Sequence, residues 1–205
     1  MAGKPRTAPR KKPRQSRSRT TVGVILQAAT KVLGQEGIDR MTTNRVAEVA
    51  GVSVGSVYQY FPNKESMVAA LAERHIQEMV ATVGTTLRAT NPSDVFGSAR
   101  RVVQAILRVH AADPAFHREL NAELSRVAIL ERIRETESRL TDLIRTVIGT
   151  KFGNVRPENL DLAAFLLVHM VIGLIHAAVA HRPELLTDPE VADEITEMAM
   201  RYVLV

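Results

Sequence analysis

Cysteine and tryptophan are absent from the 205-residue sequence, and aromatic residues make up only 4% of it. The lack of cysteine excludes disulfide bonds, thiol catalysis and cysteine-ligated zinc, and it is typical of a protein of the reducing cytoplasm. Apolar residues still reach 45%, so the chain is able to bury a sizeable core. A core of small and aliphatic side chains favours packed helices over a β-sandwich.

No segment alternates apolar and polar residues with the period of two that is typical of strands. Apolar residues recur instead every three or four positions, which predicts amphipathic helices. Such stripes begin at Ile25 and continue in residues 99–110, 130–148 and 191–202. The sequence therefore predicts an all-α fold of about nine helices.

Breaks between the helices are marked by proline, glycine and capping residues. Asn91-Pro92-Ser93 ends a long helix that starts near Lys64, and Asp113-Pro114 places an N-cap before a proline at the first helical position. Residues 149–157 form a loop before a strongly apolar helix of about residues 160–181. A capping box at residues 187–190 precedes a last helix that ends near residue 203.

The apolar stretch of residues 162–180 has the length of a membrane span. It contains His169 and His176, however, and membrane-spanning helices rarely carry ionisable side chains. We expect a helix buried in protein and no membrane partner.

Basic residues are concentrated at the N-terminus. Residues 1–20 hold eight of the 27 basic residues and no acidic one, which leaves 19 basic against 22 acidic residues in the rest of the chain. A tail rich in Lys, Arg, Pro and Ser is expected to be disordered by itself. No apolar stretch follows it closely enough for a secretory signal.

Residues 42–61 read as a short helix, a tight turn and a second short helix. Thr43 is expected to cap the first helix and Ser53 the second, because hydroxyl side chains satisfy free backbone N–H groups there. Gly51 lies at the turn, where glycine tolerates a positive φ. The small core between the helices is expected to contain Val46, Ala50, Val52 and Val57.

The outward face of the second helix carries almost no charge. Its residues are Ser53, Gly55, Ser56, Gln59 and Tyr60. A solvated face of an ordinary helical hairpin normally carries Lys and Glu. A helix that enters the major groove of DNA needs hydrogen-bonding groups and small residues and excludes acids. The pattern favours a helix-turn-helix that binds DNA.

The segment from Ile25 to Lys64 resembles the TetR family of bacterial repressors. The residues that carry this resemblance are Ala28-Ala29, Gly37, Thr42-Thr43, Val46-Ala47, Ala50-Gly51-Val52-Ser53, Gly55, Tyr58, Tyr60-Phe61 and Lys64. The resemblance implies a basic tail (1–20), a three-helix DNA-binding domain (21–64) and a helical effector-binding and dimerisation domain (65–205). It implies a transcriptional regulator, a ligand-released repressor that binds a palindromic operator as a dimer; activation is not excluded.

The resemblance also implies roles for single residues. Thr43 would cap its helix and touch a phosphate, and Tyr58 and Lys64 match phosphate-contacting positions. From their chemistry, Ser56, Gln59 and Tyr60 are candidates for base edges, although Tyr60 could instead pack in the core. The predicted DNA-binding residues are Thr43, Arg45, Ser53, Val54, Gly55, Ser56, Tyr58, Gln59, Tyr60 and Lys64.

Val54 departs from the family pattern, because many relatives carry Lys or Arg after the serine. Either a phosphate contact is missing or Val54 contacts a thymine methyl group. Residues 21–64 have a net charge of only +1. We therefore expect the tail to contact phosphates or the minor groove, the alternative being a tail that only aids solubility. The predicted tail contacts are Lys11, Lys12, Arg14, Arg17 and Arg19.

The helices after residue 65 are expected to form the dimer interface and an effector site. The last two helices are too apolar to stand alone at a surface, and in the family the corresponding helices pair two subunits. Aliphatic side chains favour a lipophilic small-molecule effector. The candidate ligand-binding residues are Leu107, His110, Phe116, Leu120, Leu143, Phe165, His169 and Ile172.

Other functions have weaker support. His110 and His117, like His169 and His176, are seven residues apart, and helical metal pairs more often use a spacing of three or four, so no metal or other cofactor is predicted. The sequence has no Gly-rich phosphate loop, nucleophile elbow or paired-carboxylate motif, which argues against an enzyme. A non-specific architectural protein that acts through the basic tail is the remaining alternative.

Overall fold

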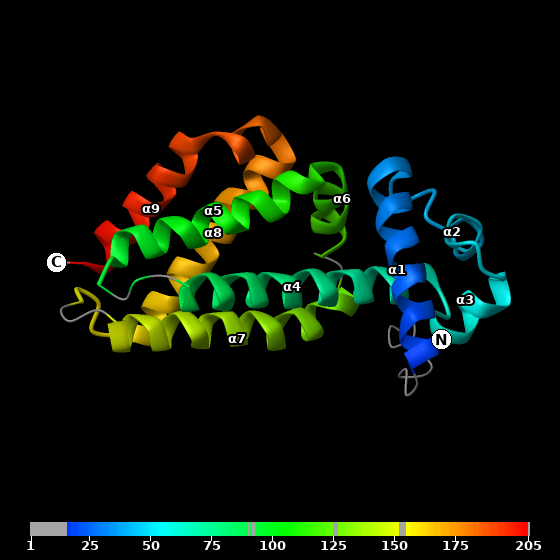
Figure 1. Cartoon of the computed structure of the whole chain (residues 1–205), viewed down its shortest axis with the longest axis horizontal. Helices are drawn as coiled ribbons and strands as arrows, with labels where there is room; N and C mark the ends of the chain where they lie inside the picture. Colours follow the sequence, from blue (N-terminus) through cyan, green and yellow to red (C-terminus); the bar gives the residue numbers. More distant parts are fainter. Residues whose placement is uncertain (1–15, 90, 92, 125–126, 152–154, 205) are drawn as a thin grey trace. The chain divides into compact units, whose positions relative to one another are not determined.

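The computed structural model describes residues 16–89, 91, 93–124, 127–151 and 155–204. These residues form nine α-helices and one short 3-10 helix (Figure 1). Within these ranges the extended backbone is limited to an isolated antiparallel bridge between Val155 and Leu204. The predicted all-α fold of about nine helices is confirmed.

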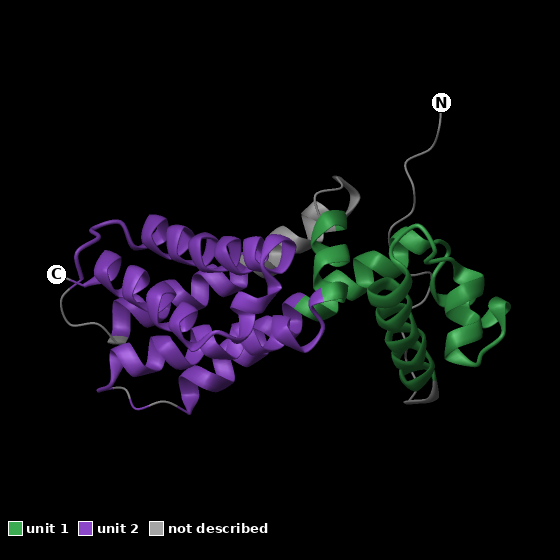
Figure 2. Ribbon diagram, turned by 90° about the horizontal axis from the view of Figure 1, so that it is seen from above, with its two compact units in different colours: residues 1–75, 115–133 green, residues 76–114, 134–205 purple. Residues whose placement is uncertain are grey.

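The chain divides into two compact units (Figure 2). Unit 1 comprises residues 1–75 and 115–133, and unit 2 comprises residues 76–114 and 134–205. Residues 115–133 thus join the unit that contains the predicted helix-turn-helix, although they lie far from it in the sequence. Two long helices, α4 (Lys64–Arg88) and α7 (Val127–Lys151), contribute residues to both units.

Unit 1 is built around α1 (Ser16–Glu36), α2 (Thr43–Ala50) and α3 (Val54–Tyr60). The start of α4 and most of α6 (Pro114–Leu124) complete it. Ile25, Val46, Val57 and Phe61 are at most 1% exposed, so the apolar stripe of α1 closes the core of the helix-turn-helix. This burial fixes the angle at which α3 is presented.

The predicted tail of residues 1–20 needs a correction, because α1 already begins at Ser16. The apolar stripe that starts at Ile25 holds the body of this helix in unit 1. Extending an existing helix costs little compared with nucleating one, which accounts for the additional polar turn. Lys11, Lys12 and Arg14 lie outside the described residues.

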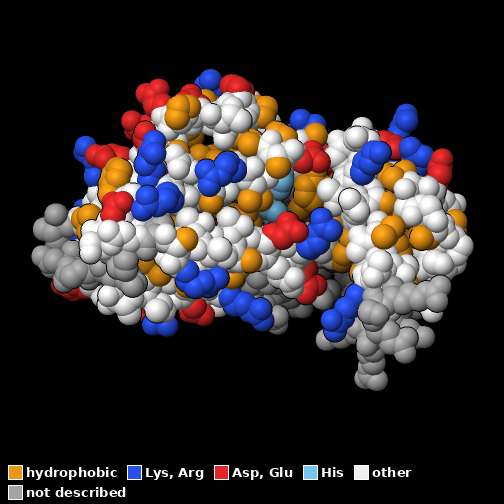
Figure 3. Space-filling view, viewed as in Figure 1, with side chains coloured by type: hydrophobic (Ala, Val, Ile, Leu, Met, Phe, Trp, Pro, Cys, Tyr) orange, Lys and Arg blue, Asp and Glu red, His pale blue; other side chains and the backbone are white. Residues whose placement is uncertain are grey.

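Unit 2 contains α5 (Val95–Ala112), α8 (Leu160–His181), the 3-10 helix η1 (Pro183–Thr187) and α9 (Pro189–Val203), together with parts of α4 and α7. The predicted bounds of the last two helices are confirmed. Val83, Val103, Ile106 and Ile175 lie in its aliphatic core. Arg100 of α5 forms an ion pair with Asp193 of α9. On the face drawn in Figure 3, charged side chains of both signs lie over these two helices with hydrophobic side chains between them.

Helix α8 is the one described helix that is long and apolar enough to cross a membrane by length and composition, with a mean hydropathy of 2.3. A single such helix is weak evidence, because core helices pass the same test. Only 33% of its most apolar window is buried within the chain, so a single chain covers this helix only in part. Its remaining apolar surface is considered below.

Candidate functional site

The first helix of the helix-turn-helix is capped by Thr42. The Thr42 hydroxyl accepts a hydrogen bond from the backbone N–H of Arg45 at 3.1 Å, and Thr42 has the extended backbone of an N-cap. The prediction that Thr43 caps this helix is therefore wrong by one residue. Adjacent threonines offer two candidate caps, and only the residue that leaves the helix geometry can serve as one.

Thr43 has another role. It is buried, and its hydroxyl donates a hydrogen bond to the Tyr58 hydroxyl at 3.0 Å. This bond links the start of α2 to the exposed face of α3, where the Tyr58 side chain is 45% exposed. Two residues predicted to lie at the DNA backbone are thus brought together, 15 positions apart in the sequence.

The turn between α2 and α3 has the predicted geometry. Gly51 adopts a φ of 66°, and its N–H bonds to carbonyl groups of the last turn of α2. Ser53 caps α3, since its hydroxyl accepts from the backbone N–H of Ser56 at 3.1 Å. The capping role predicted for Ser53 is confirmed. These bonds join groups that are close in the sequence and leave the outward face of α3 open.

That outward face lacks acidic side chains. Its exposed residues are Ser53, Val54, Gly55, Tyr58 and Gln59. Ser56 is half-buried and its hydroxyl lies 2.8 Å from that of Ser53. A Cβ atom added at Gly55 would meet only the Ser53 hydroxyl, at 3.9 Å, so the backbone there is open to close approach from outside.

Tyr60 points in a different direction from the predicted base-reading residues. Its hydroxyl lies 3.1 Å from the hydroxyl of Ser18 in α1, and the residue is half-buried. The alternative that Tyr60 packs within the domain is therefore favoured over a base contact. The same bond places the beginning of α1, from which the basic tail extends, beside the end of α3.

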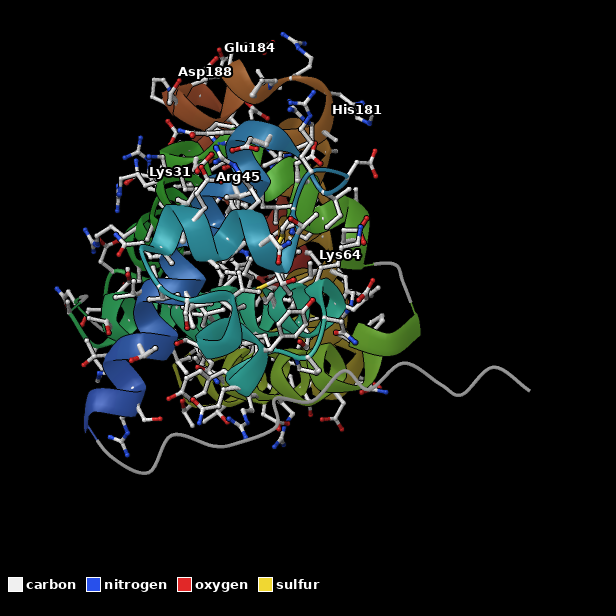
Figure 4. All side chains as sticks on the ribbon, turned by 90° about the vertical axis from the view of Figure 1, so that its right-hand side faces the viewer. Lys31, Arg45, Lys64, His181, Glu184 and Asp188 are labelled. Atoms are coloured by element: carbon white, nitrogen blue, oxygen red, sulfur yellow. The ribbon has the colours of Figure 1, made fainter. Side chains whose placement is uncertain are left out.

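Arg45, which Figure 4 labels, is held by the two carboxylates of Glu36 and Glu48. Its guanidinium donates to both oxygens of Glu36, at 2.9 and 3.1 Å from Nε, and pairs with Glu48 at 2.8 Å. The hydrogen bond from Arg45 lowers the pKa of Glu36, and the two carboxylates raise the pKa of Arg45. Arg45 thus joins the end of α1 to α2 and presents little net positive charge.

Lys64, at the start of α4 (Figure 4), lies 3.5 Å from the carbonyl oxygen of Ile38. The backbone N–H of Ile38 donates a hydrogen bond to the Glu119 carboxylate of α6 at 3.3 Å. Both backbone groups of Ile38 are therefore engaged by charged side chains. Because Lys64 is only half-buried and its hydrogen bond is long, a phosphate could compete for its ammonium group.

Unit 2 contains a separate cavity of about 180 Å³ that is partly open to solvent. Five helices line it: α4, α5, α7, α8 and α9. Among the described lining residues every side chain is aliphatic or methionine except that of Ser98. Such a cavity has room for a small apolar molecule.

Only one of the predicted ligand-binding residues, Ile172, lines this cavity. Leu107 and His110 are buried elsewhere in unit 2, and the His110 ring bonds to the Ile106 carbonyl group at 2.9 Å. Leu143 packs against the core of unit 2. For these three residues an apolar helical pattern does not distinguish a core position from a cavity wall.

The other four predicted ligand-binding residues do not line this cavity either. Phe116 and Leu120 belong to unit 1. Phe165 and His169 stack with their ring centroids 4.0 Å apart on the exposed face of α8. The prediction for the last two is corrected, because α8 carries apolar residues on nearly all sides and its inward face cannot be read from periodicity.

Several residues with clear roles were not found from the sequence. Thr42, Glu36, Ser18 and Glu119 each make a contact that shapes the DNA-binding unit. Glu119 is 81 positions from its partner, so no local pattern could reveal the contact. The Glu36–Arg45 pair is nine positions apart across a loop, and only the closing of α1 on α2 brings it together.

Family models match both parts of the chain. Residues 25–71 match the model of bacterial regulatory proteins of the TetR family, and residues 98–202 match the tetracyclin repressor-like C-terminal domain. The second match alone spans half of the sequence. The chain belongs to the TetR family. As the sequence predicted, it is a DNA-binding transcriptional regulator and not an enzyme.

Curated relatives agree with this assignment. The HTH-type transcriptional regulator YhgD of Bacillus subtilis is 30% identical over 157 residues, which are 74% of this chain and 81% of that protein. The nucleoid occlusion factor SlmA of Haemophilus ducreyi is 37% identical, but only over 40% of this chain and 39% of its own length. The second likeness is therefore confined to part of each protein.

Solved structures share the fold over nearly the whole chain. The fatty acid degradation regulator FadR from Bacillus halodurans has a TM-score of 0.72 and 18% identity, and the match covers 93% of this chain and 97% of that one. A SmeT–triclosan complex has a TM-score of 0.70 and 21% identity, with 91% and 92% covered. At these identities the likeness shows the fold alone.

Proposed function

We propose that this TetR-family regulator is a ligand-released repressor that binds a palindromic operator as a homodimer. The observation that carries the DNA-binding part is the exposed face of α3, which is capped, free of acids and open at Gly55. An α-helix of this kind fits the major groove of B-DNA and reads base edges there.

The proposed DNA contacts are of two kinds: contacts to phosphates, which position the protein, and contacts to base edges, which read the sequence. Tyr58, Lys64 and Ser53 would bond to phosphates, and the hydrogen bond donated by Thr43 would hold the Tyr58 hydroxyl in place. Gln59 would pair with a base edge, and Val54, which is 38% exposed, would contact a thymine methyl group. Arg45 supports this surface by joining α1 to α2.

A homodimer is supported by the apolar surface of α8. Leu162, Phe165, Leu166 and Leu174 are between 40% and 51% exposed in a single chain. They lie with exposed Gly173 and Ala177 on one side of the helix, at spacings of three, four, seven and eleven. An exposed apolar stripe with small residues suits close packing against a second copy of itself.

Ligand release is supported by the cavity in unit 2 and by one structure of the same fold, SmeT, which was solved as a complex with triclosan. A ligand that binds better to a conformation with wrongly spaced reading helices would shift the dimer away from DNA. Repression needs only occupancy of the operator. A regulator that acts on operator DNA has to work in the cytoplasm, which is the location that we propose.

Selection of bound fragments from genomic DNA, followed by footprinting, tests the proposal. We expect protection of a palindrome whose half-sites lie about 10 base pairs apart or a multiple of that. Protection without sequence preference would instead indicate an architectural protein.

A pair of variants tests the role of α3. Gly55→Glu should abolish protection, while Ala112→Glu, at an exposed site in unit 2, should not. Gly55 has room for the side chain, and replacing a helical glycine favours the helix.

A further inference from the structure

We propose that the cavity of unit 2 takes an uncharged alkyl compound of about seven heavy atoms with at most one hydroxyl-type polar group. This inference rests on the proposed ligand-released function and names the class of ligand. Three observations carry it: the chemistry of the lining, the volume and the hydrogen bonding of Ser98.

The lining excludes a charged ligand. Among the described residues that form the walls, none carries a charged side chain. Arg100 of α5 and Asp193 of α9, on two of the lining helices, are paired with each other, and Arg100 lowers the pKa of Asp193. Burying a carboxylate or an ammonium group without a partner costs far more than apolar burial returns. An uncharged molecule avoids this cost.

The volume limits the size. An aliphatic cavity of about 150 Å³ stays dry and binds benzene, which has six heavy atoms. By the same ratio, the present cavity of about 180 Å³ holds roughly seven. Each methylene group buried within that limit should strengthen binding about fourfold. Longer chains extend through the open side of the cavity into solvent, where further methylene groups bury little apolar surface.

Ser98 supplies the one polar side chain among the described residues of the cavity wall. Its hydroxyl donates to the carbonyl oxygen of Asn91 at 3.2 Å, so the oxygen still has a lone pair that can accept a hydrogen bond. A ligand hydroxyl would donate to it. A ligand carbonyl group would have to compete with Asn91 for the single serine proton.

The experiment compares ligands of one chain length on the full-length protein by calorimetry at pH 7. 1-Hexanol, hexanoate and hexylammonium serve as probes, with 1-butanol and 1-decanol for length. We expect 1-hexanol to bind at least tenfold more tightly than either ion and than 1-butanol, and 1-decanol to gain no more than fourfold over 1-hexanol. Equal or tighter binding of an ion, or no binding of 1-hexanol, overturns the proposal.

Cavity-filling variants locate the site. Ala99→Leu and Ala199→Leu fill the cavity from α5 and α9, and each should weaken 1-hexanol binding at least tenfold without lowering the melting temperature of the free protein. Ala112→Leu, at an exposed position of α5, is the matched control and should bind normally. Ser98→Ala should weaken 1-hexanol binding about threefold to tenfold. Unchanged binding in both filling variants contradicts the assignment of the site.

Operator binding separates this inference from the function on which it rests. If 1-hexanol binds and also releases the operator fragment, both stand. If it binds with the expected preference and leaves operator affinity unchanged, the ligand class stands and ligand release by it fails. If hexanoate or hexylammonium releases the operator while 1-hexanol does not bind, the ligand class fails and the regulatory function stands.

Discussion

At the residue scale, Tyr58 and Lys64 are both proposed to meet phosphates, but through different physics. Tyr58 offers a hydroxyl that is positioned by Thr43, whereas Lys64 offers a full charge that now rests against the Ile38 carbonyl group. Neutralising a phosphate with a cation releases counterions, and a neutral hydrogen bond does not. Salt dependence therefore distinguishes the two roles.

We expect Tyr58→Phe to weaken operator binding about tenfold or more, because a hydrogen bond to a charged group is lost. The slope of log affinity against log salt should stay unchanged in this variant. Lys64→Met should weaken binding and flatten that slope by about one. Fluorescence anisotropy over a salt series measures both. A flattened slope in the tyrosine variant, or an unchanged one in the lysine variant, would contradict the assignment.

The ion pair between Glu36 and Arg45 makes stability depend on pH. Because Arg45 lowers the pKa of Glu36 in the folded state, the pair stabilises the protein above the ordinary carboxyl pKa of about 4.3. That stabilisation is lost as the pH falls through the lowered pKa. Glu36→Gln should therefore have a lower melting temperature at pH 7 and a smaller fall between about pH 5 and pH 3.

Thermal unfolding followed by circular dichroism at each pH measures this effect. Glu158→Gln, which removes an exposed loop carboxylate, is the matched control and should follow the parent protein. If the curves of Glu36→Gln and the parent ran parallel from pH 7 to pH 3, the pair would not contribute to stability as inferred.

At the scale of single elements, α8 carries apolar residues on its outward as well as its inward face. Its inward residues, among them Ala163, Val168 and Ile175, lie in the core, and its outward residues are also apolar. A helix that is apolar on every side has to be covered on every side. Within one chain only the inward face is covered.

Leu166→Lys should therefore shift the protein from dimer to monomer at micromolar concentration, because a lysine would be buried unpaired at the centre of the interface. Analytical ultracentrifugation measures the change, and operator affinity should fall with it. Phe96→Lys, at an equally exposed apolar residue of α5, is the control and should stay dimeric. A dimeric Leu166→Lys variant would place the interface elsewhere.

Helix α3, unlike the long helix α8, has only seven residues. Its single fully buried residue, Val57, anchors it to the core, and Ser53 and Phe61 provide its N-cap and C-cap. So short a helix is not stable by itself in water. Its geometry is imposed by α1 and α2, which is why the ion pair of Arg45 and the bond between Ser18 and Tyr60 bear on DNA binding.

At the scale of the whole molecule, the charge is divided between the tail and the body. Residues 1–15 contain six basic residues and no acidic one, whereas residues 21–64 have a net charge of only +1. Non-specific attraction to DNA comes from phosphate neutralisation. The proposed tail contacts would therefore supply much of the affinity and little of the sequence specificity, with Arg19 as an exposed continuation on α1.

Deletion of residues 1–15 should weaken operator binding and flatten the salt slope by about 0.9 for each phosphate contact that is lost. The deletion stops before Ser16, so that α1 and its bond to Tyr60 stay intact. The preference for the operator over a scrambled fragment should persist. An unchanged salt slope would show that the tail serves solubility only.

The sequence by itself determined the all-α fold, the helix-turn-helix and the family. These features depend on local physics: helical periodicity, the φ of Gly51, the serine cap of α3 and the uncharged face that follows it. The same local rules placed the cap of α2 at Thr43, one residue away from the cap that the structure shows. The choice between the two threonines required the backbone of Thr42.

Only the tertiary structure decided which face of each helix points inward, and with it the role of every residue on that face. It turned Tyr60 toward α1, set Arg45 between two carboxylates, brought Glu119 to Ile38, and left Phe165 and His169 outside the cavity. The physical reason is that apolar side chains line the core, the cavity and the dimer face alike. Their chemistry does not distinguish these surfaces, and only packing between elements distant in the sequence assigns each residue to one of them.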